Sequence, residues 1–195
     1  MIKVALTGNI GSGKSIVTRI FKTMDIPVFI ADIEARQLYY REDVKGVLKQ
    51  KLGDGIFGQD GEINTRALAD IIFNDKKALR TVNSIIHPLV YEEYQQWLDI
   101  HRDAPYTLHE SAILFENNLT AHYHKTIVVT APEAIRLKRV MERDNMTEEQ
   151  VRARMANQWP EENKAKKADF VIINDGKHFL IPQILEIDKR LKLKT

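Results

Sequence analysis

Gly8-Asn9-Ile10-Gly11-Ser12-Gly13-Lys14-Ser15 stands near the amino end of the chain and follows the pattern G-x-x-x-x-G-K-S. In this P-loop pattern backbone N–H groups surround nucleotide phosphates, the lysine reaches the β- and γ-phosphates, and the serine hydroxyl coordinates Mg²⁺. The apolar run Ile2–Leu6 precedes the pattern as a buried strand would, and apolar residues follow it at helical spacing from Ile16. A helix that begins here adds unpaired N–H groups and partial positive charge. The stretch therefore predicts a phosphate-binding loop, and the alternative is a glycine-rich turn that binds nothing.

The composition is that of an ordinary globular protein. Its 195 residues are enough for one α/β domain with insertions and a sizeable core. A formal net charge of +2 is too small to indicate a nucleic-acid partner, and the absence of cysteine excludes disulfides and thiolate metal sites. Because the chain leads straight into a predicted strand and no apolar stretch approaches membrane-spanning length, we expect a soluble cytoplasmic protein without a membrane partner. We expect a monomer or a small homo-oligomer.

Short apolar strands alternate with helical patterns along most of the chain, which predicts an α/β fold with a parallel sheet flanked by helices. The candidate strands are Ile2–Leu6, Pro27–Ile30, Tyr106–His109, Thr126–Val129 and Phe170–Ile173. Two segments depart from the alternation. Residues 44–100 contain no convincing strand and are expected to be helical. Residues 139–167 are charged and mostly helical, with a capping box at Thr147–Gln150. An amphipathic helix is expected from Leu180 to the carboxyl end.

Asp32 comes directly after the second candidate strand. In an open parallel sheet the carboxyl ends of the strands surround the ligand, so this carboxylate is expected to face a transferred phosphate. An aspartate there could orient an acceptor hydroxyl and take its proton. The alternative is an N-cap for a helix over 33–40, and both roles are compatible.

Arg136, Arg139 and Arg143 follow the fourth strand at steps of three and four, so they are expected on one face of a helix. Arginine's planar fork matches phosphate oxygens, whereas the alternative is a solvated basic face. Arg152 and Arg154 extend the positive density, and Gln158 and three lysines between 164 and 167 follow them. The pattern predicts a mobile basic flap that closes over ATP and excludes water.

Glu110 and the histidines leave open interpretations. Glu110 ends the third strand, where it could stand near Mg²⁺ or be a structural acid bonded to backbone N–H groups. His87 precedes Pro88, which suggests a junction between helices. His122 and His124 are metal-ligand types, but no further ligand lies at a suitable spacing for zinc.

Several further stretches share their spacing with one enzyme family. They are Ala31-Asp32-x-x-Ala35-Arg36, Asp60-Gly61, Ile86-His87-Pro88, Leu114-Phe115-Glu116, Arg139-x-x-x-Arg143, Arg154-x-x-x-Gln158 and Asn174-x-Gly176. Together with the P-loop they resemble the dephospho-coenzyme A kinase family, over about residues 2 to 177. The resemblance implies transfer of the γ-phosphoryl of ATP to the ribose 3′-hydroxyl of dephospho-coenzyme A, the last step of coenzyme A synthesis.

The resemblance also implies an organisation and a set of roles. The P-loop kinase core would comprise 1–43, 101–138 and 168–195, with a helical acceptor (CoA) subdomain at 44–100 and a lid at 139–167. The residues implied to bind ATP are Gly8, Asn9, Gly11, Ser12, Gly13, Lys14, Ser15, Ile16 and Asn174, with Ser15 also on Mg²⁺. Asp32 would be the base, and Lys14, Arg139 and Arg143 would act on the transferred phosphate. Asp32, Arg36 and His87 would bind the acceptor, dephospho-coenzyme A.

The chain departs from the family pattern at three informative positions. Ile30 replaces the first acid of the usual Asp-Ala-Asp, so Asp32 is the acid that remains. Ile16 replaces a threonine, which is tolerable where only the backbone N–H contributes. Arg136 stands where a glutamine is usual. These departures leave the outer shell of the metal open.

Two other functions share the P-loop. A kinase for another small acceptor, such as a nucleoside monophosphate, would have the same core, lid and arginines. A P-loop switch, motor or nucleotide-dependent binding module is the second alternative. The Asn-Lys-x-Asp motif that a GTPase uses for guanine is absent from the sequence.

Overall fold

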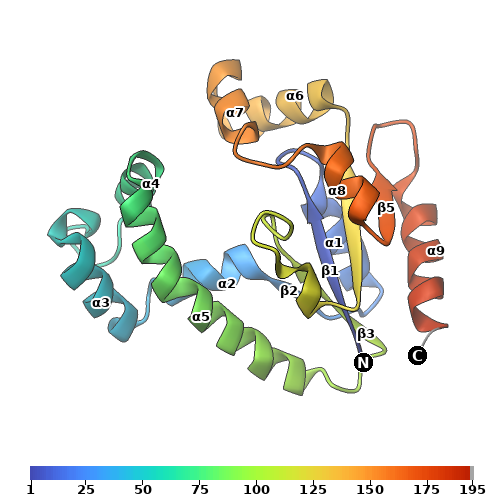
Figure 1. Cartoon of the computed structure of the whole chain (residues 1–195), viewed down its shortest axis with the longest axis horizontal. Coiled ribbons are helices and arrows are strands. Elements are labelled where there is room, and N and C mark those ends of the chain that lie inside the picture. Colours follow the sequence, from blue (N-terminus) through green and yellow to red (C-terminus); the bar gives the residue numbers. More distant parts are fainter. Residues whose placement is uncertain (194–195) are drawn as a thin grey trace. The chain divides into compact units, whose positions relative to one another are not determined.

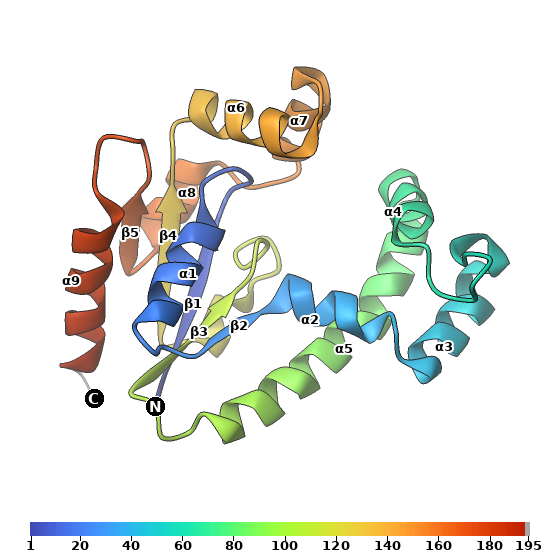
Figure 2. The same ribbon diagram turned by 180° about the vertical axis from the view of Figure 1, so that it is seen from behind.

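The computed structural model describes residues 1–193, the side chain of Phe73 excepted. The chain divides into two compact units (Figures 1 and 2). The first unit combines Met1–Ile30 with the chain from His101 onward, and the second is Ala31–Ile100.

A five-stranded sheet forms the centre of the first unit, in the order β2-β3-β1-β4-β5. All four neighbouring pairs of strands are parallel. The strands are β1 (Ile2–Gly8), β2 (Val28–Ile30), β3 (Tyr106–Glu110), β4 (Lys125–Thr130) and β5 (Phe170–Ile173). Every predicted strand and the parallel α/β fold are thus confirmed. Because all the strands are parallel, the loop that follows β1 begins at the carboxyl edge of the sheet, where ligands of such folds bind, and β1 is the central strand.

The two faces of the sheet are covered differently (Figure 2). Helices α1 (Lys14–Thr23) and α9 (Leu180–Lys192) pack on one face, where Val4 and Leu6 of β1 point. The other face receives Ala5 together with apolar side chains from the segment after β3, and α8 (Glu161–Lys167) packs against β4. This alternation along β1 follows from the period of two in a strand. The sheet is therefore buried on both faces.

Helices α6 (Glu133–Asp144) and α7 (Glu148–Met155) follow β4 and pack against each other. The capping box predicted at the start of α7 is present, since the Thr147 hydroxyl accepts from the Gln150 N–H and the Gln150 side chain accepts from the Thr147 N–H. A short 3₁₀ helix, η2 (Leu119–His122), precedes β4. The predicted amphipathic helix at the carboxyl end is α9.

The second unit contains the helices α2 (Ala31–Leu38), α3 (Glu42–Leu52), η1 (Asp54–Ile56), α4 (Thr65–Asn74) and α5 (Lys76–Ile100), and an isolated antiparallel bridge joins Phe57 to Ile63. It begins at Ala31, earlier than the boundary at 44 suggested by the sequence, because α2 packs against α5. The expected helix junction at His87–Pro88 is wrong. Helix α5 continues through Pro88, and the buried side chains of Val82, Ile86 and Leu98 hold both halves of it in the unit.

His109 of β3 is a buried histidine in the first unit. Its ring is stacked between those of Phe29 and Tyr123, with centroids 5.3 Å away in each case. The Tyr123 hydroxyl lies 2.7 Å from its Nδ1. Burial lowers the pKa of His109 from 6.5 to about 4, since the charged ring would lose its hydration.

We expect His109 to make the stability of the protein depend on pH. Its pKa is lower in the folded state, so the unfolded chain binds more protons between pH 6.5 and 4 and the stability contribution present above pH 6.5 is lost as the pH falls. From pH 7.5 to 5 this loss is about 2 kcal/mol. Urea unfolding of the His109→Phe variant, which retains an aromatic ring, should show a pH dependence reduced by that amount.

An unchanged dependence in His109→Phe would contradict the assignment.

Candidate nucleotide-binding site

The loop from Gly8 to Ser15 ends in the first turn of α1, and its backbone is built on glycines with positive φ. Gly11 has φ of 79° and Gly13, the N-cap of α1, has φ of 95°. No side chain caps this end of α1, and its first turn contains no acidic residue. The first N–H groups of a helix have no carbonyl partner within the helix. The loop therefore presents N–H groups and the positive end of a helix dipole without a neutralising acid, which suits an anion.

Glycine at these positions is also required by space. A β-carbon on Gly11 would lie 2.5 Å from the backbone oxygen of Arg136 in α6. A β-carbon on Gly13 would overlap the side-chain nitrogen of Asn174, which follows β5. The loop is thus pressed between α6 and the segment after β5, two parts of the chain far from it in sequence.

Lys14 and Glu110 bring opposite charges to the base of the loop. Lys14 Nζ donates to the Gly8 carbonyl oxygen at 2.9 Å and lies 4.0 Å from Glu110 Oε1. Their side chains are 14% and 11% exposed. Glu110 ends β3 and pairs in register with Leu6 of β1, so the sheet fixes its backbone. The ammonium group is held beside the loop, partly screened from water.

Ser15 and Ile16 are exposed in the first turn of α1, as required of a residue that meets a ligand. Ser12 is buried, and among the described residues its hydroxyl has no hydrogen-bond partner. The buried Asn9 donates from Nδ2 to the carbonyl oxygen of Trp159 at 3.0 Å.

The three arginines of α6 lie on one helix at the expected spacing, but their side chains have different surroundings. Arg136 is buried on the same side as Val140, because residues four apart in a helix lie on the same face. Its Nε donates to the Ala131 carbonyl oxygen at 3.0 Å and lies 3.5 Å from Glu161 Oε2. Arg136 therefore joins α6 to α8.

Arg143 lies at the other end of α6, with a side chain 62% exposed. Its Nε and Nη2 donate to the two carboxylate oxygens of Asp144 at 2.7 and 3.0 Å. Arg154 Nη1 donates to the same carboxylate at 3.4 Å. This pairing keeps the pKa of Asp144 below its usual range. The structure shows Arg143 engaged with Asp144, and its predicted phosphate role stays a prediction.

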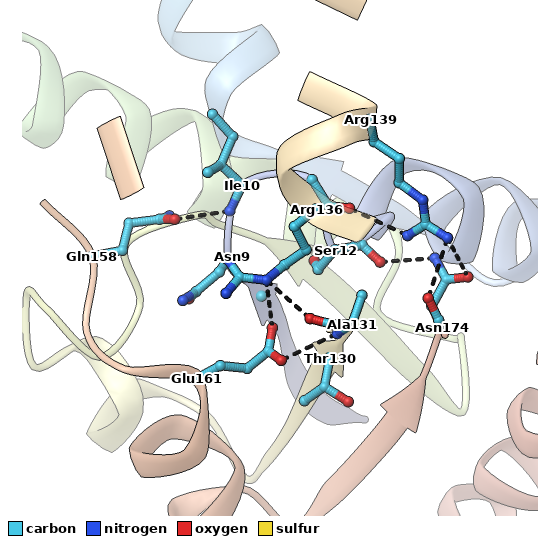
Figure 3. A network of polar contacts seen from close by, with 12 residues as sticks. Asn9, Ile10, Ser12, Thr130, Ala131, Arg136, Arg139, Gln158, Glu161 and Asn174 are labelled. Carbon is cyan, nitrogen blue, oxygen red and sulfur yellow. Dashed lines mark hydrogen bonds and ion pairs between the residues drawn. The ribbon is translucent and has the colours of Figure 1, made fainter. Parts of the chain in front are cut away.

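Arg139 is the arginine of α6 that reaches the loop (Figure 3). It donates from Nη1 to the Gly11 carbonyl oxygen at 3.3 Å and from Nη2 to the Asn174 carbonyl oxygen at 3.2 Å. A longer contact, 3.4 Å, joins Nη2 to Asn174 Oδ1. Asn174 in turn donates from Nδ2 to the Ser12 carbonyl oxygen at 2.8 Å. Arg139 and Asn174 thus form one network with the second half of the loop.

The opposite side of the loop receives Gln158 (Figure 3), whose contact the sequence did not indicate. Gln158 Oε1 accepts from the Ile10 N–H at 2.8 Å. Nearby, Glu161 Oε1 accepts from the Ala131 N–H at 3.2 Å and faces Arg136 through its other oxygen. Burial raises the pKa of Glu161, and the charge of Arg136 opposes that rise. In the sequence, Gln158 was indicated only by the family spacing Arg154-x-x-x-Gln158, which did not predict its bond to Ile10.

The remaining predicted residues belong to the second unit. Asp32 is the second residue of α2 and is exposed. The N-cap interpretation of Asp32 is wrong, because α2 begins at Ala31 and places Asp32 inside the first turn, where the helix dipole favours a carboxylate. Arg36 is exposed in the last turn of the same helix. His87 is on α5, where partial desolvation lowers its pKa.

Comparison with known proteins gives consistent matches over nearly the whole chain. A family model described as dephospho-CoA kinase matches residues 2–179. A dephospho-CoA kinase of Bacteroides fragilis (strain YCH46) is 38% identical over 187 residues, which are 95% of this chain and 91% of the relative. Another, of Porphyromonas gingivalis, is 38% identical over 199 residues and covers 100% of this chain and 96% of the relative.

The chain belongs to the dephospho-CoA kinase family. As a member of this family the protein is an ATP-dependent kinase. The P-loop and the later motifs that resemble this family in the sequence lie within the matched residues, from Gly8 to Gly176. The family resemblance predicted from the sequence is therefore confirmed.

Solved structures agree on the fold. A Thermus thermophilus crystal structure is similar with a TM-score of 0.84 and 32% identity, covering 99% of this chain and 97% of that one. A dephospho-CoA kinase from Campylobacter jejuni gives a TM-score of 0.69 at 23% identity, with 98% of both chains covered. A shikimate kinase from Bacteroides thetaiotaomicron gives 0.52 at 11% identity, again with 98% of both chains covered. The family fold is that of P-loop kinases.

Two further observations concern the described part of the chain. Its helices include none with the length and apolar character needed to cross a membrane. Within residues 1–193, no three or more His, Cys, Asp or Glu side chains gather as a metal-binding group would.

Substituting Gly13 should be more costly than substituting another glycine of similar φ. Gly176 has φ of 81° and open space around its missing β-carbon, whereas Gly13 has a side chain in that place. Both alanine variants should lose folding stability, because alanine is strained at a positive φ. Gly13→Ala should lose at least about 1 kcal/mol more in urea unfolding, because Asn174 must move as well.

Gly176→Ala is the matched control for this measurement. Equal losses in the two variants would contradict the close packing of Asn174 on the loop.

Proposed function

We propose that the protein transfers the γ-phosphoryl group of ATP to the ribose 3′-hydroxyl of dephospho-coenzyme A, giving coenzyme A. The observation that supports this most strongly is the glycine loop at the uncapped end of α1, with Lys14 beside it, in a chain of the dephospho-CoA kinase family. The loop suits the triphosphate of ATP. The family assignment selects the acceptor.

The loop would bind the β- and γ-phosphates of ATP through backbone N–H groups between Gly8 and Ile16 at the start of α1, other than the Ile10 N–H, which donates to Gln158. Lys14 would exchange its bond to the Gly8 carbonyl oxygen for a phosphate oxygen, because a charged acceptor is the stronger partner of an ammonium group. Arg139 donates to uncharged oxygens of Gly11 and Asn174. Because a phosphate oxygen is a stronger acceptor, Arg139 would exchange these bonds for bonds to phosphate. Asn174 would lie beside the bound nucleotide, as the family resemblance implies.

The residues at the loop fit a Mg²⁺ ion that arrives with ATP. The exposed Ser15 hydroxyl at the start of α1 would be its protein ligand, and Glu110 would stand behind Lys14 as a further acid. Mg²⁺ binds such sites through few protein groups, phosphate oxygens and water, so no cluster of acids is needed. When bound, the ion supplies positive charge to the β- and γ-phosphate oxygens.

The acceptor would be bound by residues of the second unit. Asp32 would orient the 3′-hydroxyl and take its proton as the attacking oxygen loses it. Arg36 and His87 would contact the acceptor, and both belong to the compact helical unit Ala31–Ile100. Residues 139–167 would cover the nucleotide, and Arg143 would add a phosphate contact after leaving Asp144.

The reaction would be a direct in-line transfer. Phosphoryl transfer requires little covalent chemistry from the protein, so positioning and electrostatic stabilisation supply most of the rate. Lys14 and Arg139 would stabilise charge on the γ-phosphoryl group, since both are held beside the loop before the nucleotide binds.

A panel of acceptors with labelled ATP tests the proposal. Dephospho-coenzyme A should be phosphorylated with a kcat/KM at least about tenfold above that for AMP, CMP or shikimate, a difference of about 1.4 kcal/mol in transition-state binding. Preference for a nucleoside monophosphate would favour the alternative kinase, and ATP binding without transfer to any acceptor would favour a nucleotide-dependent binding module.

Asp32→Asn should separate catalysis from nucleotide binding. The amide cannot take a proton, so kcat should fall by roughly 10²–10⁴. The affinity for ATP, measured by calorimetry, should change little because Asp32 would act on the acceptor.

The matched control is Glu34→Gln, which removes another carboxylate from the same first turn and should leave kcat and the affinity for ATP close to wild type. A large loss of ATP affinity in Asp32→Asn would instead assign Asp32 to the metal shell or to structure.

A further inference from the structure

The segment between α7 and α8 crosses the first half of the phosphate loop and bonds to two consecutive loop residues. Gln158 Oε1 accepts from the Ile10 N–H at 2.8 Å, and the Trp159 carbonyl oxygen accepts from Asn9 Nδ2 at 3.0 Å. We refer to Gln158–Trp159 as the strap. Figure 3 shows Gln158 on the side of the loop away from Arg139 and Asn174.

The loop has little internal structure with which to hold its own shape. Among the described residues, one backbone hydrogen bond lies within Gly8–Gly13, from the Ser12 N–H to the Asn9 carbonyl oxygen at 3.0 Å. Glycines with positive φ give the second half many other accessible conformations in the absence of contacts. If a loop becomes ordered only when ATP binds, the entropy cost of ordering it lowers the affinity for ATP. Contacts that already order the loop in the free protein remove this cost.

The strap is itself fixed to the core. The Trp159 N–H donates to Glu116 Oε1 at 3.0 Å, and the same oxygen lies 2.6 Å from Lys164 Nζ. The Lys164 side chain is 0% exposed, so separating Lys164 from Glu116 would leave a buried ammonium group without its ion-pair partner. The Trp159 ring is stacked on Phe115, with centroids 6.3 Å apart. Gln158 therefore projects from an anchored backbone.

We propose that Gln158 is a positioning residue for the phosphate loop, acting through the Ile10 N–H. The proposal rests on the proposed ATP-dependent function and deepens it, because it identifies what holds the loop ready for the triphosphate. The strap and α8 then belong to the fixed phosphate site. Within residues 139–167, the part free to cover the nucleotide ends before Gln158.

Two substitutions separate the hydrogen bond of Gln158 from its packing. Gln158→Met keeps the length and volume of the side chain and removes the acceptor, whereas Gln158→Ala removes both. Loss of one positioning hydrogen bond should weaken ATP binding in calorimetry by about tenfold in each variant. In steady-state kinetics KM for ATP should rise by a similar factor, with KM for dephospho-coenzyme A and the melting temperature close to wild type.

Asn157→Ala is the matched control. Asn157 is exposed next to the strap, and its side chain donates to the carbonyl oxygen of Ala153 in the last turn of α7. This variant should bind ATP as the wild type does.

Wild-type ATP affinity in Gln158→Met would overturn the proposal, as would a uniform fall in melting temperature, kcat and both KM values, which indicates a structural role alone. Calorimetry with ATP needs no acceptor, so it tests Gln158 even where the acceptor panel fails. A wild-type protein that binds ATP but does not phosphorylate dephospho-coenzyme A would overturn the proposed function and leave the calorimetric result decisive for Gln158. A wild-type protein that binds no ATP would overturn both.

Discussion

The loop after β1 is confined on both sides, and this confinement fixes much of the first unit. On one side the backbone of Arg136 leaves no room for a β-carbon at Gly11, and the amide of Asn174 leaves none at Gly13. On the other side Gln158 and Trp159 bond to Ile10 and Asn9. Helix α6, the segment after β5 and the segment before α8 are therefore positioned by contact with one loop. Because these three parts are far apart in sequence, the loop can take this shape only in the folded unit.

Charge around the loop is arranged so that positive groups remain available to an anion. Glu161 faces Arg136 and Glu116 faces Lys164, so each of these acids near the strap has a basic partner of its own. Arg139 differs, because the oxygens of Gly11 and Asn174 to which it donates are uncharged. Breaking such neutral bonds costs less than separating an ion pair, and a phosphate oxygen more than replaces them. The arrangement keeps Arg139 at the site without neutralising it.

Local patterns in the sequence were sufficient for the five strands, the phosphate loop and the capping box of α7, since each depends on residues close together in the chain. Long-range contacts were not predictable in the same way. Arg136 was expected to face phosphate together with Arg139 and Arg143, but it is buried against Glu161, a partner that comes from another helix. Gln158 carried no local signal for its bond to Ile10. The first residue of α2 and the continuation of α5 through Pro88 were likewise decided by packing within the second unit rather than by local preference.

Apart from the Arg139 guanidinium, which is itself available to an anion, the groups that hydrogen-bond the loop from outside are uncharged. They are the side-chain amides of Gln158 and Asn174 and the backbone carbonyl of Trp159. A carboxylate at 158 would accept from the Ile10 N–H more strongly, but it would repel the phosphates that the loop is shaped to receive. A lysine at 174 would attract the phosphates, but it would lose the side-chain oxygen that accepts from Arg139 Nη2 and leave only the backbone carbonyl oxygen as an acceptor. Amides can hydrogen-bond the backbone of an anion site without adding charge to it. The acid that anchors the strap, Glu116, is paired with Lys164, and the nearby Glu161 faces Arg136.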